Sequence, residues 1–368
     1  MWLHFVFFIV IIIFCVLQKV LLPNSNKKRL LFWGSFIFFG VFIACRAYTV
    51  GNDTQEYYRF FKVIMTQPSI SNMVSETRYE IGYVFLNYIV SRVTHNFTVL
   101  LIIITSFYLY SSFRLIRRYA KTPELAIVLM FTLSLFYFAM NIERQCIAMA
   151  IFYFAIPFLE KKKCISYCVI VIIASLFHKS AIILLILAFL PKINFTNKNT
   201  LLKWEILSFS GLIFLNIGIT KILEMFPYFQ HYYAGSIYSE GGIRVASVVF
   251  FVIRLLIVLL VKVEGGFRLI EDDISKNGYV FYMLLFMDLV VAAASIGFNL
   301  FDRIEKYFTL GYIIVITNAI YSLGSGGRIQ KNNKVITTII VISLTFAYIT
   351  STVLLRSSWL GIFPYSFV

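Results

Sequence analysis

The stretch FTVLLIIITSFYLYSSFRLIRRYAK, residues 97–121, decides the fold class of this chain. Residues 97–113 carry no charge and form an apolar run that is close to the length needed to cross a bilayer as a helix. Four cations follow directly, namely Arg114, Arg117, Arg118 and Lys121. Because basic residues gather at the cytoplasmic ends of membrane helices, this stretch is predicted to be a membrane span that ends inside the cell.

Apolar runs of this kind recur along the 368 residues, of which 60% are apolar, and the mean hydropathy is +0.85. The runs are continuous rather than alternating, which favours helices over a β-barrel. We therefore expect an all-α, polytopic integral membrane protein that forms one membrane domain over residues 1–368, with about 10–12 transmembrane or re-entrant helices. The candidate spans are 2–22, 30–45, 97–113, 124–140, 143–160, 204–222, 245–262, 279–297, 307–323 and 336–355.

Two further regions do not fit single spans. Residues 81–94 form a short apolar piece ahead of the span 97–113, and residues 164–190 form an apolar run that a polar triplet beginning at His178 interrupts. The second run is long for one untilted helix and short for two full ones. We interpret the first region as a re-entrant piece and the second as a broken helical hairpin with His178 near its tip.

The distribution of Lys and Arg sets the orientation in the membrane. Of the 33 basic residues, 20 fall in loops assigned to the inside and 11 fall outside, an asymmetry that follows the positive-inside rule. The net charge of +16 is therefore explained by cytoplasmic loops, and no nucleic-acid partner is expected. The segments left on the outer face are 46–79, 141–145, the tip at His178, 223–244 and 299–306.

Isolated ionisable residues lie beside these apolar runs and fall on the outer side of the predicted topology. They are Arg46, Asp53, Arg78, Glu80, Arg144, His178, Arg244 and Arg303. A charge at membrane depth is costly unless it is paired or faces a watery cavity. The pattern predicts a polar cavity that opens outward and has arginine as its main cation.

The first outer segment, RAYTVGNDTQEYYRFF, begins at Arg46. In it Gly51 permits a turn, and Asp53 and Thr54 are suited to cap the next short helix. An amphipathic helix at the membrane surface would explain the segment equally well. Farther along, RYEIGY places two opposite charges where the chain re-enters the membrane, and an ion pair between Arg78 and Glu80 is one interpretation.

The segment NIERQCIA places Asn141, Arg144 and Gln145 on roughly one face at the start of a span. Free backbone N–H groups, the helix dipole and a guanidinium together favour an anion there. In LFHKSA, His178 is either a packing residue or a functional group. The tyrosines of loop 223–244 are suited both to anchoring at the interface and to stacking on sugars.

Charged residues farther along the chain fall into an outer turn and into the spans themselves, and we interpret the two groups differently. Arg303 and Tyr307 belong to another outer turn, FDRIEKYF, together with Asp302. Arg254 and Asp288 lie within consecutive spans, and we expect them to neutralise each other as a structural pair. No nucleotide-phosphate loop, zinc-ligand spacing or serine-nucleophile motif is present, so neither a metal nor a cofactor is expected.

At these residues the chain resembles the EpsG family of Wzy-like bacterial exopolysaccharide polymerases. The resemblance rests on four patterns in a fixed order between the spans, with a later outer R-x3-Y at Arg303 and Tyr307. The patterns are R-x4-G-x-D-x3-Y (Arg46, Gly51, Asp53, Tyr57), E-x-G-Y (Glu80, Gly82, Tyr83), N-x2-R-Q-x-I-A (from Asn141) and F-H-K-S-A (Phe177–Ala181).

The resemblance implies a Wzy-like or GT-C-like helical bundle in the bacterial cytoplasmic membrane, with its active site facing outward. The enzyme would join oligosaccharide repeat units that are carried on undecaprenyl pyrophosphate, and it would need no metal. A flippase and a chain-length regulator would be its partners. Arg144, Arg244 and Arg303 would bind the pyrophosphate or an anionic sugar, since the planar guanidinium pairs with phosphate oxygens. Arg46, Arg78, Asn141, Gln145 and Tyr307 are further substrate-binding candidates, and Asp53, then Glu80 or His178, are candidates for the base.

Three alternatives remain open at this point. A ligase of the O-antigen type would move a finished glycan to a different acceptor. A transporter or flippase of lipid-linked oligosaccharides would show internal pseudo-symmetry and a path of charges at mid-membrane depth. A structural scaffold of an assembly complex would leave the isolated outer arginines unexplained.

Overall fold

The computed structural model describes residues 2–20, 25–69, 77–192, 244–267, 279–298, 300–324 and 328–368. Within these residues the chain forms fifteen helical segments, and strand pairing is limited to one isolated bridge between Arg46 and Phe367. The predicted all-α class is confirmed. The predicted span 204–222 and the outer loop 223–244, apart from Arg244, lie outside the described residues.

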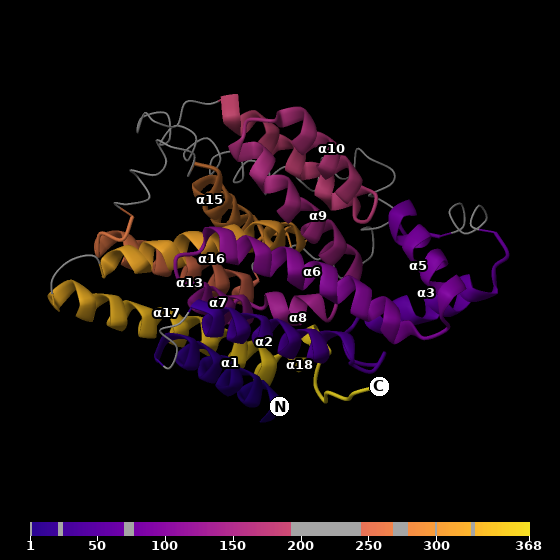
Figure 1. Ribbon diagram of the computed structural model, residues 1–368, viewed down its shortest axis with the longest axis horizontal. Helices are drawn as coiled ribbons and strands as arrows, with labels where there is room; N and C mark the ends of the chain where they lie inside the picture. Colours follow the sequence, from indigo (N-terminus) through magenta and orange to yellow (C-terminus); the bar gives the residue numbers. More distant parts are fainter. Residues whose placement is uncertain are drawn as a thin grey trace. The chain divides into compact units, whose positions relative to one another are not determined.

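The chain forms two compact units. The first comprises Met1–Leu190 and Thr345–Val368, and the second comprises Pro191–Leu344. The first unit contains α1 (Trp2–Val20), α2 (Ser25–Ala44), α3 (Thr54–Thr66), α5 (Ile81–Val93), α6 (Phe97–Tyr119), α7 (Pro123–Thr132), α8 (Leu135–Ala139), α9 (Glu143–Glu160), α10 (Cys164–Ser175), most of η1 (Lys179–Lys192) and α18 (Ser357–Leu360) (Figure 1). The second contains α13 (Val245–Val263), α15 (Tyr279–Ala294), α16 (Phe301–Leu323) and the first part of α17 (Arg328–Leu355).

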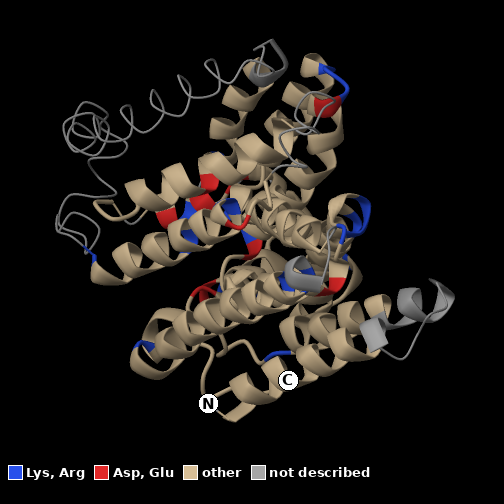
Figure 2. Cartoon of the chain, turned by 90° about the vertical axis from the view of Figure 1, so that its left-hand side faces the viewer, with Lys and Arg blue, Asp and Glu red and all other residues tan. Residues whose placement is uncertain are grey.

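Helix lengths agree with a polytopic membrane protein. Three described stretches are long and apolar enough to cross a bilayer, namely Phe97–Tyr119, Val245–Val263 and Lys331–Leu355. Seven shorter apolar helices accompany them in the described part of the chain. Along most helices charged residues are sparse, and they gather in a few places (Figure 2). The chain is thus an all-α polytopic membrane protein.

Helix α13 has one exposed apolar face and one buried face. Its exposed apolar residues recur every three or four positions, so they occupy one face of the helix. They are Val245, Val249, Val252, Leu256, Leu259 and Val263. Another face buries Ser247, Phe250, Arg254, Ile257 and Val261. An apolar stripe of this kind suits contact with lipid, and Ser247 and Arg254 turn to the protein interior.

The predicted span 124–140 is not one helix. Ser134 adopts the left-handed conformation, with φ of 71°, so α7 ends at Thr132 and α8 begins at Leu135. A serine carries no sequence signal as strong as glycine or proline for such a break.

Residues 81–94 and 164–190, the two regions that did not fit single spans, form a short helix and a broken run, respectively. Helix α5 has 13 residues, which at 1.5 Å per residue gives about 20 Å, less than the hydrocarbon thickness of about 30 Å. The run 164–190 divides into α10 and η1. The hydroxyl of Tyr167 donates to the carbonyl of Leu184 at 2.7 Å, so the chain folds back on itself between these residues.

Candidate functional site

The carboxylate of Glu80 lies at the meeting point of three segments of the first unit. Nη1 of Arg144 donates to its Oε2 at 2.5 Å. The backbone N–H of Lys179 donates to its Oε1 at 3.1 Å, and Nδ1 of His178 lies 3.6 Å from the same oxygen. The structure thus brings together three predicted site residues that the sequence separates by up to 98 positions.

Local structure explains why Glu80 reaches this place. It is the residue before α5, its backbone is extended, and its side chain does not cap its own helix. Instead the carboxylate accepts the first backbone N–H of η1, one of the donors that a helix start leaves without an intrahelical partner. The N–H of Gly82 donates to Leu176 at 2.8 Å, where a Cβ would crowd that carbonyl oxygen. Glycine therefore allows α5 to approach the end of α10.

The environment of Glu80 keeps its carboxyl group ionised. Burial alone would raise the pKa of Glu80, but the contact with His178, the charge of Arg144 and the N–H of Lys179 lower this pKa to about 2. A carboxylate with so low a pKa is a weak base. Glu80 is therefore better suited to holding Arg144 in place than to accepting a proton.

Aromatic rings fix the other side of Arg144. Its Cζ lies 4.8 Å from the ring centre of Tyr79 and 5.9 Å from that of Tyr57, distances that suit cation–π contacts. Its side chain is 15% exposed, and its Nε has no hydrogen-bond partner among the described residues. Arg78 is exposed and lies 5.6 Å from the same Tyr79 ring. Two guanidinium groups thus flank one tyrosine at the edge of the unit.

A second ion pair lies beside the first. Nη2 of Arg46 is 3.2 Å from Oε1 of Glu143, and Tyr83 donates its hydroxyl to Oε2 of Glu143 at 3.2 Å. Arg46 and Glu143 are both almost fully buried. Sequence reasoning missed Glu143, although an acid in the first turn of an otherwise apolar helix was a signal for a buried partner of an arginine.

The turn after Arg46 is fastened to the chain before α9. Asn141 accepts the N–H of Asn52 at 2.7 Å, and the hydroxyl of Thr54 donates to the carbonyl of Met140 at 3.0 Å. Gly51 has φ of +95°, and a Cβ there would collide with the carbonyl oxygen of Met140. The turn therefore requires glycine at this position.

Replacing Gly51 with alanine should lower the folding stability by about 1–3 kcal/mol, because alanine would be strained in this conformation and would push the turn away from Met140. The thermal unfolding midpoint in detergent measures the effect. Gly40→Ala within α2 is the matched control, since its Cβ would meet only Leu109, at 3.9 Å. That change should be neutral or stabilise the protein by up to about 1 kcal/mol. Equal midpoints for the two variants would contradict the strain argument.

Asp53 occupies the N-cap position of α3, as predicted, but its side chain makes no capping hydrogen bond. Thr54 does not cap the helix either, because its hydroxyl is bonded to Met140. The carboxyl group of Asp53 is half-buried. Among the described residues no donor is bonded to it, which leaves it available as a base.

Two other expectations for this region are corrected. Glu80 pairs with Arg144 rather than with its sequence neighbour Arg78. Asn141 does not share a helical face with Arg144, because α9 begins only at Glu143. Asn141 instead holds the turn at Asn52 and donates to Tyr137. Gln145 is fully buried in α9 and so lies beneath the surface of the unit.

In the second unit, Arg244 and Arg303 lie at one end. Nη1 of Arg244 donates to Asp302, the residue before Arg303, at 2.7 Å, and the pair is partly exposed. Arg303 is half-buried, whereas Tyr307 is almost fully buried.

Deeper in this unit, Arg254 pairs with Asp288, as predicted, and with Glu305 at 2.5 Å. Lys306 lies 3.6 Å from Glu305. The side chains of Arg254, Asp288 and Glu305 are fully buried, and the four charges cancel. Their mutual neutralisation supports a structural role.

Within the described residues, no three His, Cys, Asp or Glu side chains gather as metal ligands do. The site geometry therefore assigns no residue to a metal. The described side chains around Glu80 are paired arginines and carboxylates with tyrosine rings beside them.

Comparison with known proteins gives one result for the whole chain. The model of the EpsG family matches residues 30–367. No curated protein and no solved structure matched the chain. The match includes all four patterns that meet in the first unit, from Arg46 to Ala181. The chain therefore belongs to the EpsG family, a family of Wzy-like polysaccharide polymerases of the membrane.

Proposed function

We propose that this protein joins oligosaccharide repeat units on the outer face of the bacterial cytoplasmic membrane. The growing glycan, carried on undecaprenyl pyrophosphate, is transferred to a hydroxyl group of the next lipid-linked unit. A flippase supplies these units, and a chain-length regulator acts on the product. The observation that best supports the proposal is the meeting of the four family patterns around the Arg144–Glu80 pair.

The reaction needs a stabilised leaving group and a base. The bond between the anomeric carbon and the pyrophosphate oxygen breaks, and the lipid pyrophosphate leaves with the electron pair. The acceptor hydroxyl forms the new glycosidic bond and gives its proton to the base. Guanidinium groups stabilise the negative charge that develops on the leaving oxygen, as donors in an oxyanion hole do.

Arg144 is our first candidate for binding the pyrophosphate, with Arg244 and Arg303 assigned to the pyrophosphate or to an anionic sugar. The contact of Arg78 with the same Tyr79 ring supports a secondary role for Arg78. Arg46 is buried against Glu143, so we assign it to positioning the site beside Arg144 rather than to binding the pyrophosphate. For the base we favour Asp53, whose carboxylate is half-buried and not bonded to a described donor, with His178 next.

Deletion of the gene tests this function. Single lipid-linked repeat units should accumulate on the outer leaflet, and polymer should disappear, while a copy of the wild-type gene restores it. Separation of the lipid-linked material by size distinguishes single repeat units from polymer. Cleavage by an externally added glycosidase shows that the units are on the outer leaflet, whereas protection shows that they are on the inner leaflet. Units retained on the inner leaflet would support a flippase instead. Polymer of normal length that is not attached to its acceptor would support a ligase. Polymer that is unchanged in amount, length and attachment would support a structural scaffold.

A further inference from the structure

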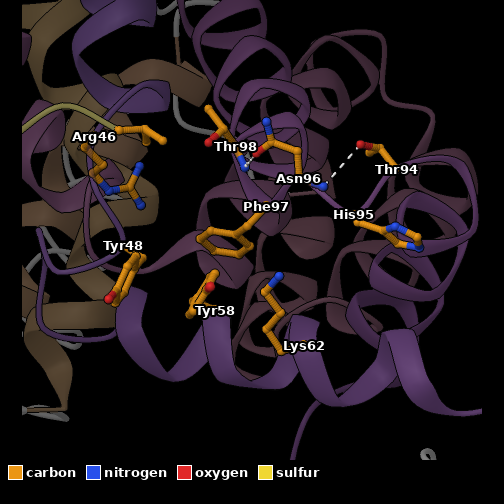
Figure 3. Close-up of a pocket in the computed structure, with 10 residues that line it drawn as sticks. Arg46, Tyr48, Tyr58, Lys62, Thr94, His95, Asn96, Phe97 and Thr98 are labelled. Atoms are coloured by element: carbon orange, nitrogen blue, oxygen red, sulfur yellow. Dashed lines mark hydrogen bonds between the residues drawn. The ribbon is translucent and has the colours of Figure 1, made fainter.

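A pocket of about 540 Å³ lies beside α3 in the first unit. It is lined by residues of α3, the turn after α2 and the connection between α5 and α6 (Figure 3). Its volume falls within the range of small-molecule sites, about 300–1,000 Å³. The groups assigned above to the pyrophosphate and to the base do not line this pocket.

Helix α3 separates this pocket from the candidate active site. Tyr57 contacts the ring of Tyr83 and lies near Arg144, whereas the next residue, Tyr58, lines the pocket. Arg46 belongs to both regions, because it lines the pocket and pairs with Glu143, the neighbour of Arg144 in α9. A ligand in the pocket would therefore lie next to the proposed site of glycosyl transfer.

The pocket combines aromatic rings with cations. The rings of Tyr48 and Tyr58 stack with centroids 4.4 Å apart and planes 16° apart, and Phe97 meets Tyr58 edge-on at 5.5 Å. Lys62 lies one helical turn after Tyr58, with its Nζ 5.5 Å from the Tyr58 ring. The Nε of Arg46 is buried and has no partner among the described residues. None of the ten lining residues has a carboxylate side chain.

These features fit a sugar better than a plain hydrocarbon. The C–H face of a sugar ring packs on an aromatic ring, and its hydroxyl groups need polar partners such as Asn96, Thr94 and Thr98, which also line the pocket. Arg46 and Lys62, the two basic residues among those that line the pocket, favour a negatively charged group on the ligand. We propose that this pocket is a glycan-binding subsite that takes a sugar residue carrying an acidic group. The inference rests on the proposed function, which supplies the glycan.

Binding to the purified full-length chain in phosphatidylcholine nanodiscs tests the subsite. The probes are oligosaccharide fragments of the polysaccharide made by the source cells, before and after chemical removal of their acidic groups. Lys62→Ala should weaken binding of the acidic fragments about tenfold, equal to about 1.4 kcal/mol, and should leave the neutralised fragments unaffected. Tyr58→Ala should weaken both. Because Lys62 is exposed, its replacement does not endanger folding.

Arg59→Ala is the matched control. Arg59 is an exposed cation on the same helix, it pairs with Glu56 at 2.5 Å, and it does not line the pocket. Binding should be unchanged in this variant. Equal effects of Arg59→Ala and Lys62→Ala, or full binding by both pocket variants, would overturn the proposal. Competition by phosphatidylglycerol that depends on Lys62, without glycan binding, would identify a lipid-headgroup site and would also overturn it.

The same assay separates this inference from the proposed function. Arg144→Gln should abolish polymer formation yet retain fragment binding, since Arg144 does not line the pocket. If gene deletion left polymer intact, the proposed function would fail, while Tyr58-dependent binding of the fragments would still support the subsite.

Discussion

Replacing Arg144 with glutamine should lower polymer yield by about 10²–10³-fold, the loss seen when one donor to a developing negative charge is removed. Single lipid-linked repeat units should accumulate in its place. Arg144 is held by Glu80 and by the rings of Tyr57 and Tyr79, so its guanidinium is already oriented before substrate binds. Arg144→Lys should also be strongly impaired, because lysine keeps the charge but lacks the planar fork.

The double variant Arg144→Gln with Glu80→Gln distinguishes binding from folding. Arg144→Gln alone leaves the buried carboxylate of Glu80 without its cation, which reduces stability. The double variant is neutral at both positions and should recover the protein level of the wild type without recovering polymer. Arg59→Gln, an exposed cation outside the site, should leave polymer unchanged. Polymer restored in the double variant would show that Arg144 has only a structural role.

The sequence predicted the helices better than the partners of their charges. Apolar runs placed α9 and α13 to within a residue or so, since burial and lipid contact both follow hydropathy. The pair of Arg254 with Asp288 was predicted correctly, because both charges lie within apolar spans, whereas proximity in the chain suggested the wrong partner, Arg78, for Glu80. The actual partner, Arg144, is 64 residues away in α9, and the two meet because α5 contacts the end of α10, which itself packs against α9.

Two acidic residues were missed for a common reason. Glu305 was placed in an outer turn, but α16 already begins at Phe301, so Glu305 lies in its second turn and faces the interior. Glu143 stands likewise in the first turn of α9. Both fall in segments that the predicted topology assigned to the outer face, 141–145 and 299–306, where a carboxylate is expected to be solvated rather than buried. The arginines were noticed because they are isolated charges beside apolar runs.

Arg254→Leu should cost about 3–5 kcal/mol of folding free energy, the usual penalty for removing one member of a buried ion pair. The change makes α13 more apolar, so poorer membrane insertion cannot explain a loss of protein. The loss would arise because, among the described residues, Asp288 and Glu305, both fully buried, would keep only Lys306 as a counter-charge. The amount of folded protein in the membrane and the unfolding midpoint in detergent measure it.

Adding Glu305→Leu to Arg254→Leu should recover part of the lost stability, because Asp288 and Lys306 then leave the network neutral again. Arg244→Ala is the control, since its pair with Asp302 is about one-third exposed and is expected to contribute no more than about 1 kcal/mol. If Arg244→Ala were as damaging as Arg254→Leu, burial would not set the strength of these pairs. If the double variant were no better than the single one, the cost would come from lost packing around Phe250, which Arg254 covers at 4.1 Å, rather than from unpaired charge.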